Sequence, residues 1–255
     1  MPVLGDYSRG VPEGDSLHRI ARELQPLVGE SVSIELPSPR ARLLGLERLQ
    51  GRKLESVQAV GKQLLLRFEG GLVLRSHLGM SGRWRLLDAA ATPAGRPWLV
   101  LRGGQHAAAQ WNGPTLDLAR GEPALGLGPD ILAEPPQLDQ MIENLRSTAQ
   151  ERALGEALLD QRLLSGVGNI WRAEGLWRAR LSPWRPLAKT GDDGLRRLLT
   201  ETAGAMQESL RGQRPRHAAY RRGGRPCPRC GTPIDSRAQG DAARTAYWCP
   251  SCQRY

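Results

Sequence analysis

Four cysteines near the end of the 255-residue chain have the spacing of a metal site. Cys227 and Cys230 form one Cys-x2-Cys knuckle, Cys249 and Cys252 form a second, and eighteen residues separate the two. Paired knuckles at this spacing predict a tetrahedral thiolate site for zinc. Because four protein thiolates leave no open position for water, we expect one structural Zn²⁺ per chain.

Two disulfides, or iron in a rubredoxin-like site, are the alternatives for these cysteines. The start of the chain has no apolar run like that of a secretory signal, and no stretch has the length and hydrophobicity of a membrane span. We therefore expect a cytoplasmic protein with no membrane partner. Thiols in the cytoplasm stay reduced, which favours bound metal over disulfides.

The charge of the chain is strongly basic, with a formal net value of +10. Lysine occurs only at positions 53, 62 and 189, so 33 of the 36 basic residues are arginines. The arginine guanidinium matches the geometry of phosphate oxygens, and a basic surplus of this kind predicts a nucleic-acid partner. A GC-rich genome, in which arginine codons are frequent, is the alternative explanation.

The first half of the chain has the pattern of a β-rich domain. After residues 1–11, which we expect to be unstructured, a helix is predicted to begin with Asp15 as its N-cap and to end at Gly29. Short β-like runs follow, of which the last two form a predicted hairpin; they cover residues 31–36, 53–60, 62–68 and 71–76. A series of short strands predicts a sandwich or a barrel.

The second half is predicted to be helical. A linker rich in proline and glycine covers residues 119–136, and the pattern then predicts helices over 138–149, 153–161 and 169–179. Apolar residues at helical spacing between Leu195 and Leu210 predict another helix, and an arginine-rich stretch leads from it into the cysteine knuckles. The expected fold class is therefore α+β.

Five motifs occur in an order that resembles the formamidopyrimidine-DNA glycosylase / endonuclease VIII family, and the resemblance covers residues 12–255. The motifs are the start Val11–Arg19, the pair Gly61–Lys62, the run Ser76–Gly82, the segments Leu158–Gln161 and Gly166–Glu174, and the knuckle sequences Arg225–Ile234 and Tyr247–Gln253. Each motif alone is a weak or moderate signal. Their shared order makes coincidence very improbable.

The resemblance implies a domain organisation and an activity. It implies an N-terminal extension over residues 1–11, a catalytic β-sandwich domain over 12–133, a helix–two-turns–helix DNA-binding domain over 134–222 and a zinc finger over 223–255. It also implies a monomeric enzyme of base excision repair that acts on damaged DNA in the bacterial cytoplasm, at the nucleoid when bound. Such an enzyme removes an oxidised base through a Schiff base and cleaves the strand by β,δ-elimination.

Pro12 and Glu13 are the catalytic pair that the resemblance implies. The secondary amine of Pro12 would attack C1′ of the sugar, and Glu13 would transfer protons at the sugar and the base. Pro12 can react only as a free chain terminus, so either Val11 is decoded as an initiator methionine and removed, or the chain is processed. If residues 1–11 are retained, the alternative is a non-catalytic protein that binds damaged DNA. Pro2 is a less suitable nucleophile, because no carboxylate follows it. Without the family resemblance, Pro12 would be interpreted as a proline at the entry of a helix. Glu13 would be interpreted as an acidic residue that stabilises the start of that helix.

Further site residues are implied at five positions. Lys62 would contact phosphate near the lesion and assist elimination, His77 would contact phosphate, and Met80 would fill the gap left by a flipped nucleotide. Asn169, at the start of a predicted helix, and Arg244, within the zinc finger, would bind the phosphates around the lesion. Each of these residues also has a purely structural interpretation. These are, in order, an exposed lysine on a strand for Lys62, a packed histidine for His77, a core methionine for Met80, a helix N-cap for Asn169 and a solvated arginine for Arg244.

Departures from the family pattern favour oxidised pyrimidines over oxidised purines as substrates. The purine branch carries a lysine shortly before its Leu-Leu-Asp-Gln motif and an Arg-Phe pair, whereas this chain has 154–157 LGEA and 110–114 QWNGP at these places. The stretch of about sixteen residues between Leu210 and Cys227 is short for a loop that caps a purine. The run 77–80 HLGM favours the purine branch, so both substrate classes stay open at this point.

Overall fold

A computed structural model describes residues 12–213 and 216–254 of the chain. Residues 1–11, where we predict an unstructured extension, lie outside the described part. Contacts between residues divide the chain into two compact units. The first contains Pro12 and Ser16–Leu125, and the second contains Glu13–Asp15 and the chain from Gly126 onward.

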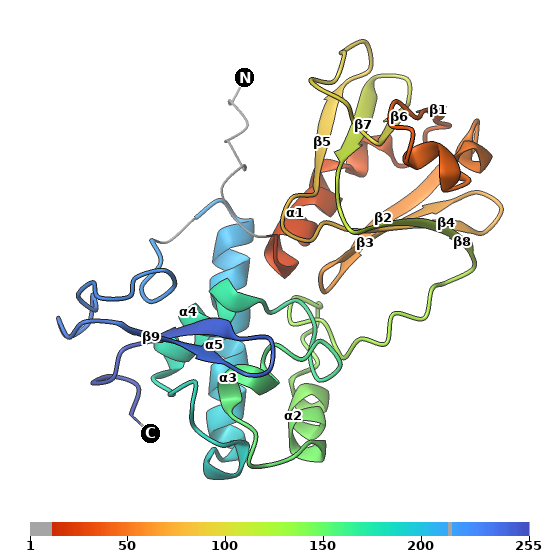
Figure 1. The fold of residues 1–255 in the computed structure, drawn as a ribbon. Coiled ribbons are helices and arrows are strands. Elements are labelled where there is room, and N and C mark those ends of the chain that lie inside the picture. The colour runs from red at the N-terminus through yellow and green to blue at the C-terminus, as the bar shows by residue number, and fades with distance from the viewer. Residues whose placement is uncertain (1–11, 214–215, 255) are drawn as a thin grey trace. The chain divides into compact units, whose positions relative to one another are not determined.

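The first unit contains two four-stranded antiparallel sheets and most of one α-helix (Figure 1). Helix α1 (Gly14–Glu23) precedes the strands. One sheet has the order β1-β6-β7-β5, with β1 (Ser33–Glu35), β6 (Leu99–Arg102), β7 (His106–Trp111) and β5 (Arg83–Asp88). The other has the order β2-β3-β4-β8, with β2 (Leu54–Val60), β3 (Gln63–Phe68), β4 (Leu72–His77) and β8 (Thr115–Arg120).

A single hydrophobic core joins the two sheets, which confirms the predicted sandwich. Alternate residues of β3, β4 and β6 point to this core, as the period of two in a strand requires. Leu17 and Ala21 of α1 complete it at helical spacing, together with Leu24 directly after the helix. The sheets contribute Leu64, Leu66 and Phe68 from β3, Leu72 and Leu74 from β4, Leu99 and Leu101 from β6, and Ala108 from β7.

The second unit is helical and ends in a β-hairpin. Its helices are α2 (Leu138–Ser147), α3 (Leu154–Ala157), α4 (Asn169–Ala179) and α5 (Asp192–Leu210), and its hairpin strands are β9 (Asp235–Gln239) and β10 (Arg244–Trp248). Helices α4 and α5 pack closely at Gly175, where a Cβ atom would lie 2.1 Å from Oγ1 of Thr202. Short 3-10 helices occur in both units, at η1 (Gln25–Leu27), η2 (Ala41–Leu43), η3 (Leu46–Leu49) and η4 (Leu187–Lys189).

Several predicted elements match the structure, and others differ for identifiable reasons. The hairpin of β3 and β4 forms as expected, and Gly70 and Gly71 in its turn have φ of 81° and 71°. Asp15 is not an N-cap, because α1 already begins at Gly14. The helix predicted over 153–161 is limited to α3, since the carboxylate of Asp160 accepts a hydrogen bond from the backbone N–H of Arg162 and draws the chain into a turn.

No helix in the described part of the chain has the length and hydrophobicity needed to cross a membrane.

Candidate zinc centre and catalytic residues

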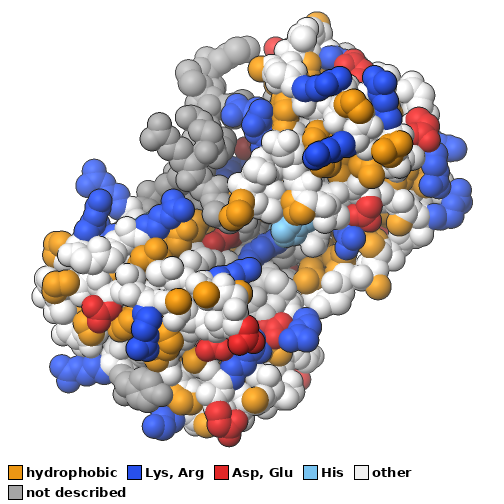
Figure 2. All heavy atoms as spheres, viewed as in Figure 1, with side chains coloured by type: hydrophobic (Ala, Val, Ile, Leu, Met, Phe, Trp, Pro, Cys, Tyr) orange, Lys and Arg blue, Asp and Glu red, His pale blue; other side chains and the backbone are white. Residues whose placement is uncertain are grey.

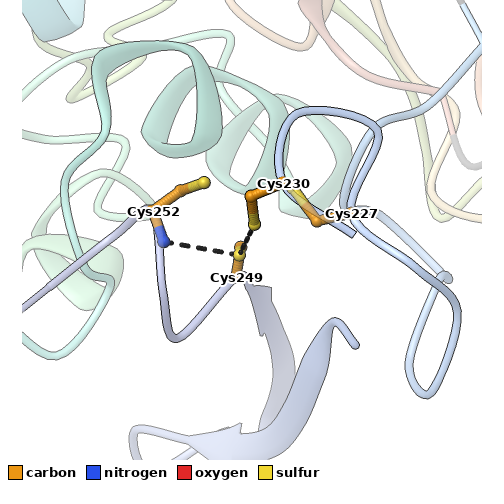
Figure 3. A group of neighbouring side chains, drawn as sticks. All are labelled: Cys227, Cys230, Cys249 and Cys252. Atoms are coloured by element: carbon orange, nitrogen blue, oxygen red, sulfur yellow. Dashed lines mark hydrogen bonds between the residues drawn. The ribbon is translucent and has the colours of Figure 1, made fainter. Parts of the chain in front are cut away.

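The four cysteines gather at one point of the second unit (Figure 3). Their sulfur atoms all lie within 4.8 Å of one another, and the sulfurs of Cys230 and Cys249 are 3.5 Å apart. None of the four is in a disulfide. Cys227 and Cys249 are buried, whereas Cys230 is exposed.

This arrangement fits one structural zinc ion. With zinc–sulfur bonds of about 2.3 Å, the sulfurs of a tetrahedral centre lie about 3.8 Å apart, close to the separations present here. Backbone hydrogen bonds shape the first knuckle, since Cys227 N–H donates to Thr232 O at 2.8 Å and Gly231 N–H donates to Cys227 O at 2.9 Å. Zinc bound by Cys227, Cys230, Cys249 and Cys252 cross-links the two knuckles and stabilises the folded tail.

Glu13 is held by the first turn of helix α4. Its side chain is 2 % exposed, and its carboxylate accepts hydrogen bonds from the backbone N–H groups of Gly168 at 3.0 Å, Ile170 at 2.7 Å and Trp171 at 3.2 Å. The N–H groups of a first helical turn have no partner within the helix, so a carboxylate from elsewhere in the chain can satisfy them. Glu13 therefore fills the anion site at the start of α4 with a fixed orientation.

Two glycines allow Glu13 to approach α4. A Cβ atom on Gly168 would lie 2.3 Å from Cδ of Glu13, and one on Gly14 would lie 2.8 Å from Cα of Gly166. Gly14 N–H also donates to Gly166 O at 2.9 Å. The Glu-Gly motif at 13–14 and the Gly-Val-Gly motif at 166–168 are far apart in the sequence, and they pack directly against each other in the fold.

The turns before α4 are fixed by Gln161, a residue of the Leu-Leu-Asp-Gln motif. Its side chain accepts a hydrogen bond from Gly166 N–H at 3.1 Å and donates one to Val167 O at 3.0 Å. On the other side of the contact, Asp15 accepts hydrogen bonds from the Trp171 indole at 2.9 Å and from the Ser209 hydroxyl at 2.8 Å. Gln161 thus fixes the turns that contact Glu13, and Asp15 anchors the segment that carries Glu13. The sequence did not identify Asp15 as part of the site.

Asn169 contacts the strand that Arg244 begins, and both belong to the second unit. Gly168 is the N-cap of α4, so the N-cap interpretation of Asn169 is wrong. Asn169 instead donates from Nδ2 to Thr245 O at 3.0 Å, while its Oδ1 atom is buried without a hydrogen-bond partner. Arg244 is the exposed first residue of β10 and immediately precedes Thr245.

Arg172 is a buried side chain that sequence reasoning missed. It is 1 % exposed and donates to Thr245 O at 2.7 Å, Arg244 O at 3.3 Å and Gln239 Oε1 at 3.2 Å. Burial, reinforced by the positive charge of Arg244, lowers its pKa to about 10. Arg172 thus fixes the backbone at Arg244 and Thr245. The sequence signal that could have identified it was the presence of an arginine among the apolar residues of this predicted helix.

The first unit contains Pro12 and three further predicted residues. Pro12 is half-buried, and Lys62 lies between β2 and β3, directly after Gly61 with φ of 57°. His77 ends β4, and its Nδ1 accepts a hydrogen bond from Gly79 N–H at 3.1 Å. Burial lowers the pKa of His77, and the positive charges of Lys62 and Arg75 lower it further.

Met80 is 83 % exposed in the turn between β4 and β5. The interpretation of Met80 as a core methionine is therefore wrong. An exposed methionine of this kind is available to insert into a partner, which is the role that the family resemblance implies.

Basic side chains are scattered over the visible surface of both units and do not gather in one patch (Figure 2). This distribution agrees with the formal net charge of +10.

Models of three protein families match successive parts of the chain. They are described as the formamidopyrimidine-DNA glycosylase N-terminal domain, matched by residues 11–112, the formamidopyrimidine-DNA glycosylase H2TH domain, matched by 127–217, and the zinc finger found in FPG and IleRS, matched by 224–254. The three matches together cover most of the sequence.

The proteins similar to this chain are named either as endonuclease 8 or as formamidopyrimidine-DNA glycosylase. The probable endonuclease 8 2 of Streptomyces coelicolor is 35% identical over 262 residues, covering 95% of this chain and 94% of that protein. The formamidopyrimidine-DNA glycosylase of Thermus thermophilus is 35% identical over 271 residues, covering 95% and 98%. A structure of Lactococcus lactis formamidopyrimidine-DNA glycosylase, non-covalently bound to DNA containing an AP site, matches with a TM-score of 0.81 and 25% identity, covering 96% and 100%.

Proposed function

Because the chain belongs to the formamidopyrimidine-DNA glycosylase / endonuclease VIII family, we propose that it removes oxidised pyrimidines from DNA through a Schiff base on Pro12. Enzymes of this base-excision-repair family are DNA glycosylases with abasic-site lyase activity. We further propose that this chain cleaves the strand by β- and δ-elimination.

The observation that carries the proposal is the fixed carboxylate of Glu13. Three backbone N–H groups at the start of α4, one of them from the N-cap Gly168, orient it, and it directly follows Pro12 in the chain. A proton-transfer group has to be held within reach of the reacting atoms by a rigid support. Packing that excludes any side chain at Gly168 and Gly14 supplies this rigidity.

The proposed reaction begins with the neutral secondary amine of Pro12. A terminal amine has a pKa of roughly 8, so a useful fraction is neutral near pH 7. The nitrogen lone pair attacks C1′ while the glycosidic bond breaks, and Glu13 delivers a proton to the leaving base. Glu13 then takes the single N–H proton from the C1′-bound proline nitrogen and passes it to O4′. The C1′–O4′ bond breaks, and the opened sugar is joined to Pro12 as an iminium ion. Glu13 is the proposed group for these proton transfers.

Strand cleavage follows from the same iminium ion. Removal of a C2′ proton breaks the C3′–O bond with a phosphate as the leaving group, which is β-elimination. A second proton loss breaks the C5′–O bond, which is δ-elimination, and water then releases the sugar fragment from Pro12. In the printed sequence Pro12 is joined to Val11, so the proposed active form begins at Pro12.

Four further residues are proposed to bind DNA phosphates. Lys62 and His77 belong to the first unit, and Asn169 and Arg244 to the second. Lys62 and Arg244 are also proposed to assist elimination, because a cation near the leaving phosphate stabilises the negative charge that develops there. Asn169 and Arg172 both bond to the backbone carbonyl of Thr245, the residue after Arg244, and on this basis we propose that Asn169 and Arg244 bind the same phosphate group. Met80 is proposed to occupy the space left by the flipped nucleotide.

Two candidate substrate classes are distinguished by excision measurements. Oxidised pyrimidines are favoured because Gln110, Trp111 and Asn112 occupy the place where the purine branch has its Arg-Phe pair. Oxidised purines are the second candidate because the run 77–80 HLGM matches the purine branch. We expect single-turnover excision of thymine glycol to be faster than excision of 8-oxoguanine from duplex DNA of otherwise equal sequence. Faster excision of 8-oxoguanine would assign the enzyme to the purine class.

A further inference from the structure

The indole of Trp177, near the end of helix α4, contacts the first cysteine knuckle. Its Nε1–H group donates a hydrogen bond to the sulfur of Cys227 at 3.4 Å. Cys227 is only 2 % exposed, and Trp177 is half-buried against the same apolar cluster, which also contains Ile234 and Cys249. The indole N–H is therefore directed at a sulfur that water hardly reaches.

Arg229 holds this indole in place from within the knuckle. Its guanidinium carbon lies 4.0 Å from the centre of the Trp177 ring, within the range of a cation–π contact. One of its nitrogens also donates to Trp177 O at 3.1 Å. Because Arg229 stands between Cys227 and Cys230, a single knuckle contacts the indole N–H, the ring face and the backbone carbonyl of Trp177.

A hydrogen bond to a zinc-bound thiolate affects the metal centre in two ways. The donor orients the sulfur, and it stabilises the negative charge that the sulfur keeps after binding zinc. Cys249 has a comparable donor in the backbone N–H of Cys252, at 3.4 Å. Cys227 also receives backbone hydrogen bonds from Arg229 and Cys230, but its Trp177 donor is a side chain on a helix outside the finger, so a substitution can remove it.

We propose that Trp177 is a positioning residue of the zinc centre, and that the metal is coupled through it to helix α4. The first turn of the same helix binds Glu13, so the helix connects the zinc knuckle to the anion site. This proposal depends on the assignment of Cys227 as a zinc ligand. It does not depend on the proposed catalytic role of Pro12.

The test is zinc release from a Trp177→Phe variant of the full chain. Phenylalanine keeps an aromatic ring for Arg229 but has no N–H donor. Loss of a hydrogen-bond partner of a metal ligand typically weakens metal binding by about 10–100-fold, so we expect zinc to pass to a chromophoric chelator about 10–100-fold faster than from the unchanged protein.

Trp184→Phe is the matched control. Trp184 packs against Trp248, the residue before Cys249, with ring centres 5.4 Å apart, and Arg237 stacks on it at 3.9 Å. Its indole nitrogen is buried without a hydrogen-bond partner, so this variant removes a neighbouring indole N–H that does not contact sulfur. We expect it to release zinc at the unchanged rate.

Cobalt substitution reports on the hydrogen bond itself. Without the N–H donor the sulfur electrons of Cys227 lie higher in energy, so the thiolate-to-cobalt charge-transfer band should move to longer wavelength in Trp177→Phe and stay in place in Trp184→Phe. Because the band arises only from protein that has bound cobalt, poor metal loading does not hide the result. An unmoved band, unchanged zinc release, or equal effects in both variants would overturn the proposal.

Discussion

Glu13 serves both the fold and the proposed chemistry. As a buried acceptor for three N–H groups it satisfies the first turn of α4, and as the neighbour of Pro12 it is the proposed proton-transfer group. These two tasks are compatible, because satisfying the helix terminus also fixes the direction of the carboxylate. A substitution here is expected to affect stability and activity together.

Replacement of Glu13 by glutamine tests this dual role. The amide presents one oxygen and one NH₂ group to three N–H donors, so at least one buried donor loses its partner at a cost of about 1–3 kcal/mol. We expect Glu13→Gln to lower the free energy of unfolding in urea by that amount and to abolish base excision. Glu55→Gln, at an exposed position of β2, is the control and should leave both unchanged. A Glu13→Gln protein with unchanged stability would contradict the observed geometry.

His77 is expected to be neutral near pH 7. Burial first, and then Lys62 and Arg75, lower its pKa in the folded protein below the ordinary value of 6.5. Its contribution to stability is therefore present above pH 6.5 and is lost as the pH falls through the folded pKa. An NMR titration, with the signal assigned by comparison with His77→Gln, should give a midpoint below 6.5 that rises when DNA phosphate binds. A midpoint at or above 6.5 in the free protein would refute this.

At the scale of elements, helix α4 organises the second unit. Its first turn binds Glu13, its middle holds the zinc hairpin through Arg172, and Trp177 near its end contacts Cys227. The long helix α5 supports it along one side, through the close approach at Gly175 and an ion pair of Arg178 with Glu208 at 2.7 Å. One helix thus fixes the relative positions of three functional groups.

Gly168→Ala tests the contact between α4 and Glu13. The added methyl group would lie 2.3 Å from Cδ of Glu13, so the carboxylate has to move. We expect a loss of roughly 1–3 kcal/mol in the free energy of unfolding, as for other overpacked sites, and a large loss of excision rate. Gly204→Ala in α5 is the matched control, because a Cβ atom there meets nothing within 4 Å. Helix propensity favours alanine there by about 0.5–1 kcal/mol, so this control should keep activity and gain stability.

The sequence predicted those elements whose signals are local. The glycines before Asn169 and the apolar pattern after it were enough to place α4 over 169–179, the observed bounds. The predicted helix over 153–161 was too long, because Asp160 bonds its own neighbouring backbone and this competition is not visible in hydrophobic periodicity.

Contacts between distant segments could not be predicted in the same way. Glu13 and Gly168 are 155 residues apart in the chain, so both motifs were recognised but their contact was not. Arg172 was missed because a buried guanidinium depends on carbonyl groups of the zinc hairpin, which exist only in the folded protein. The exposure of Met80 is likewise a property of the fold, since its sequence is equally compatible with a core position.

At the scale of the whole molecule, the chain combines two units and a strong positive charge. Contacts place the helical region and the zinc tail in one unit, and the divisions predicted near residues 133 and 222 stay predictions. With a net charge of +10, DNA binding should release counterions and weaken steeply as salt concentration rises.

Arg244→Ala should weaken DNA binding without loss of zinc. Its exposed guanidinium is a proposed phosphate contact, so its removal should lower affinity and reduce the salt dependence by about one charge. Titrations of labelled DNA at several salt concentrations, together with zinc content, measure both effects. Arg254→Ala, another exposed arginine of the tail, is the control. Zinc loss in Arg244→Ala, or equal weakening by the control, would contradict the assigned role.

The most direct test of the account is covalent trapping on DNA that contains an abasic site. Borohydride reduces an iminium ion to a stable amine, so a protein that begins at Pro12 should become permanently linked to the DNA. The same chain with residues 1–11 retained should not be trapped, because its Pro12 nitrogen is an amide. No adduct from the shorter protein, or equal adducts from both, would contradict the assignment of Pro12 as the nucleophile.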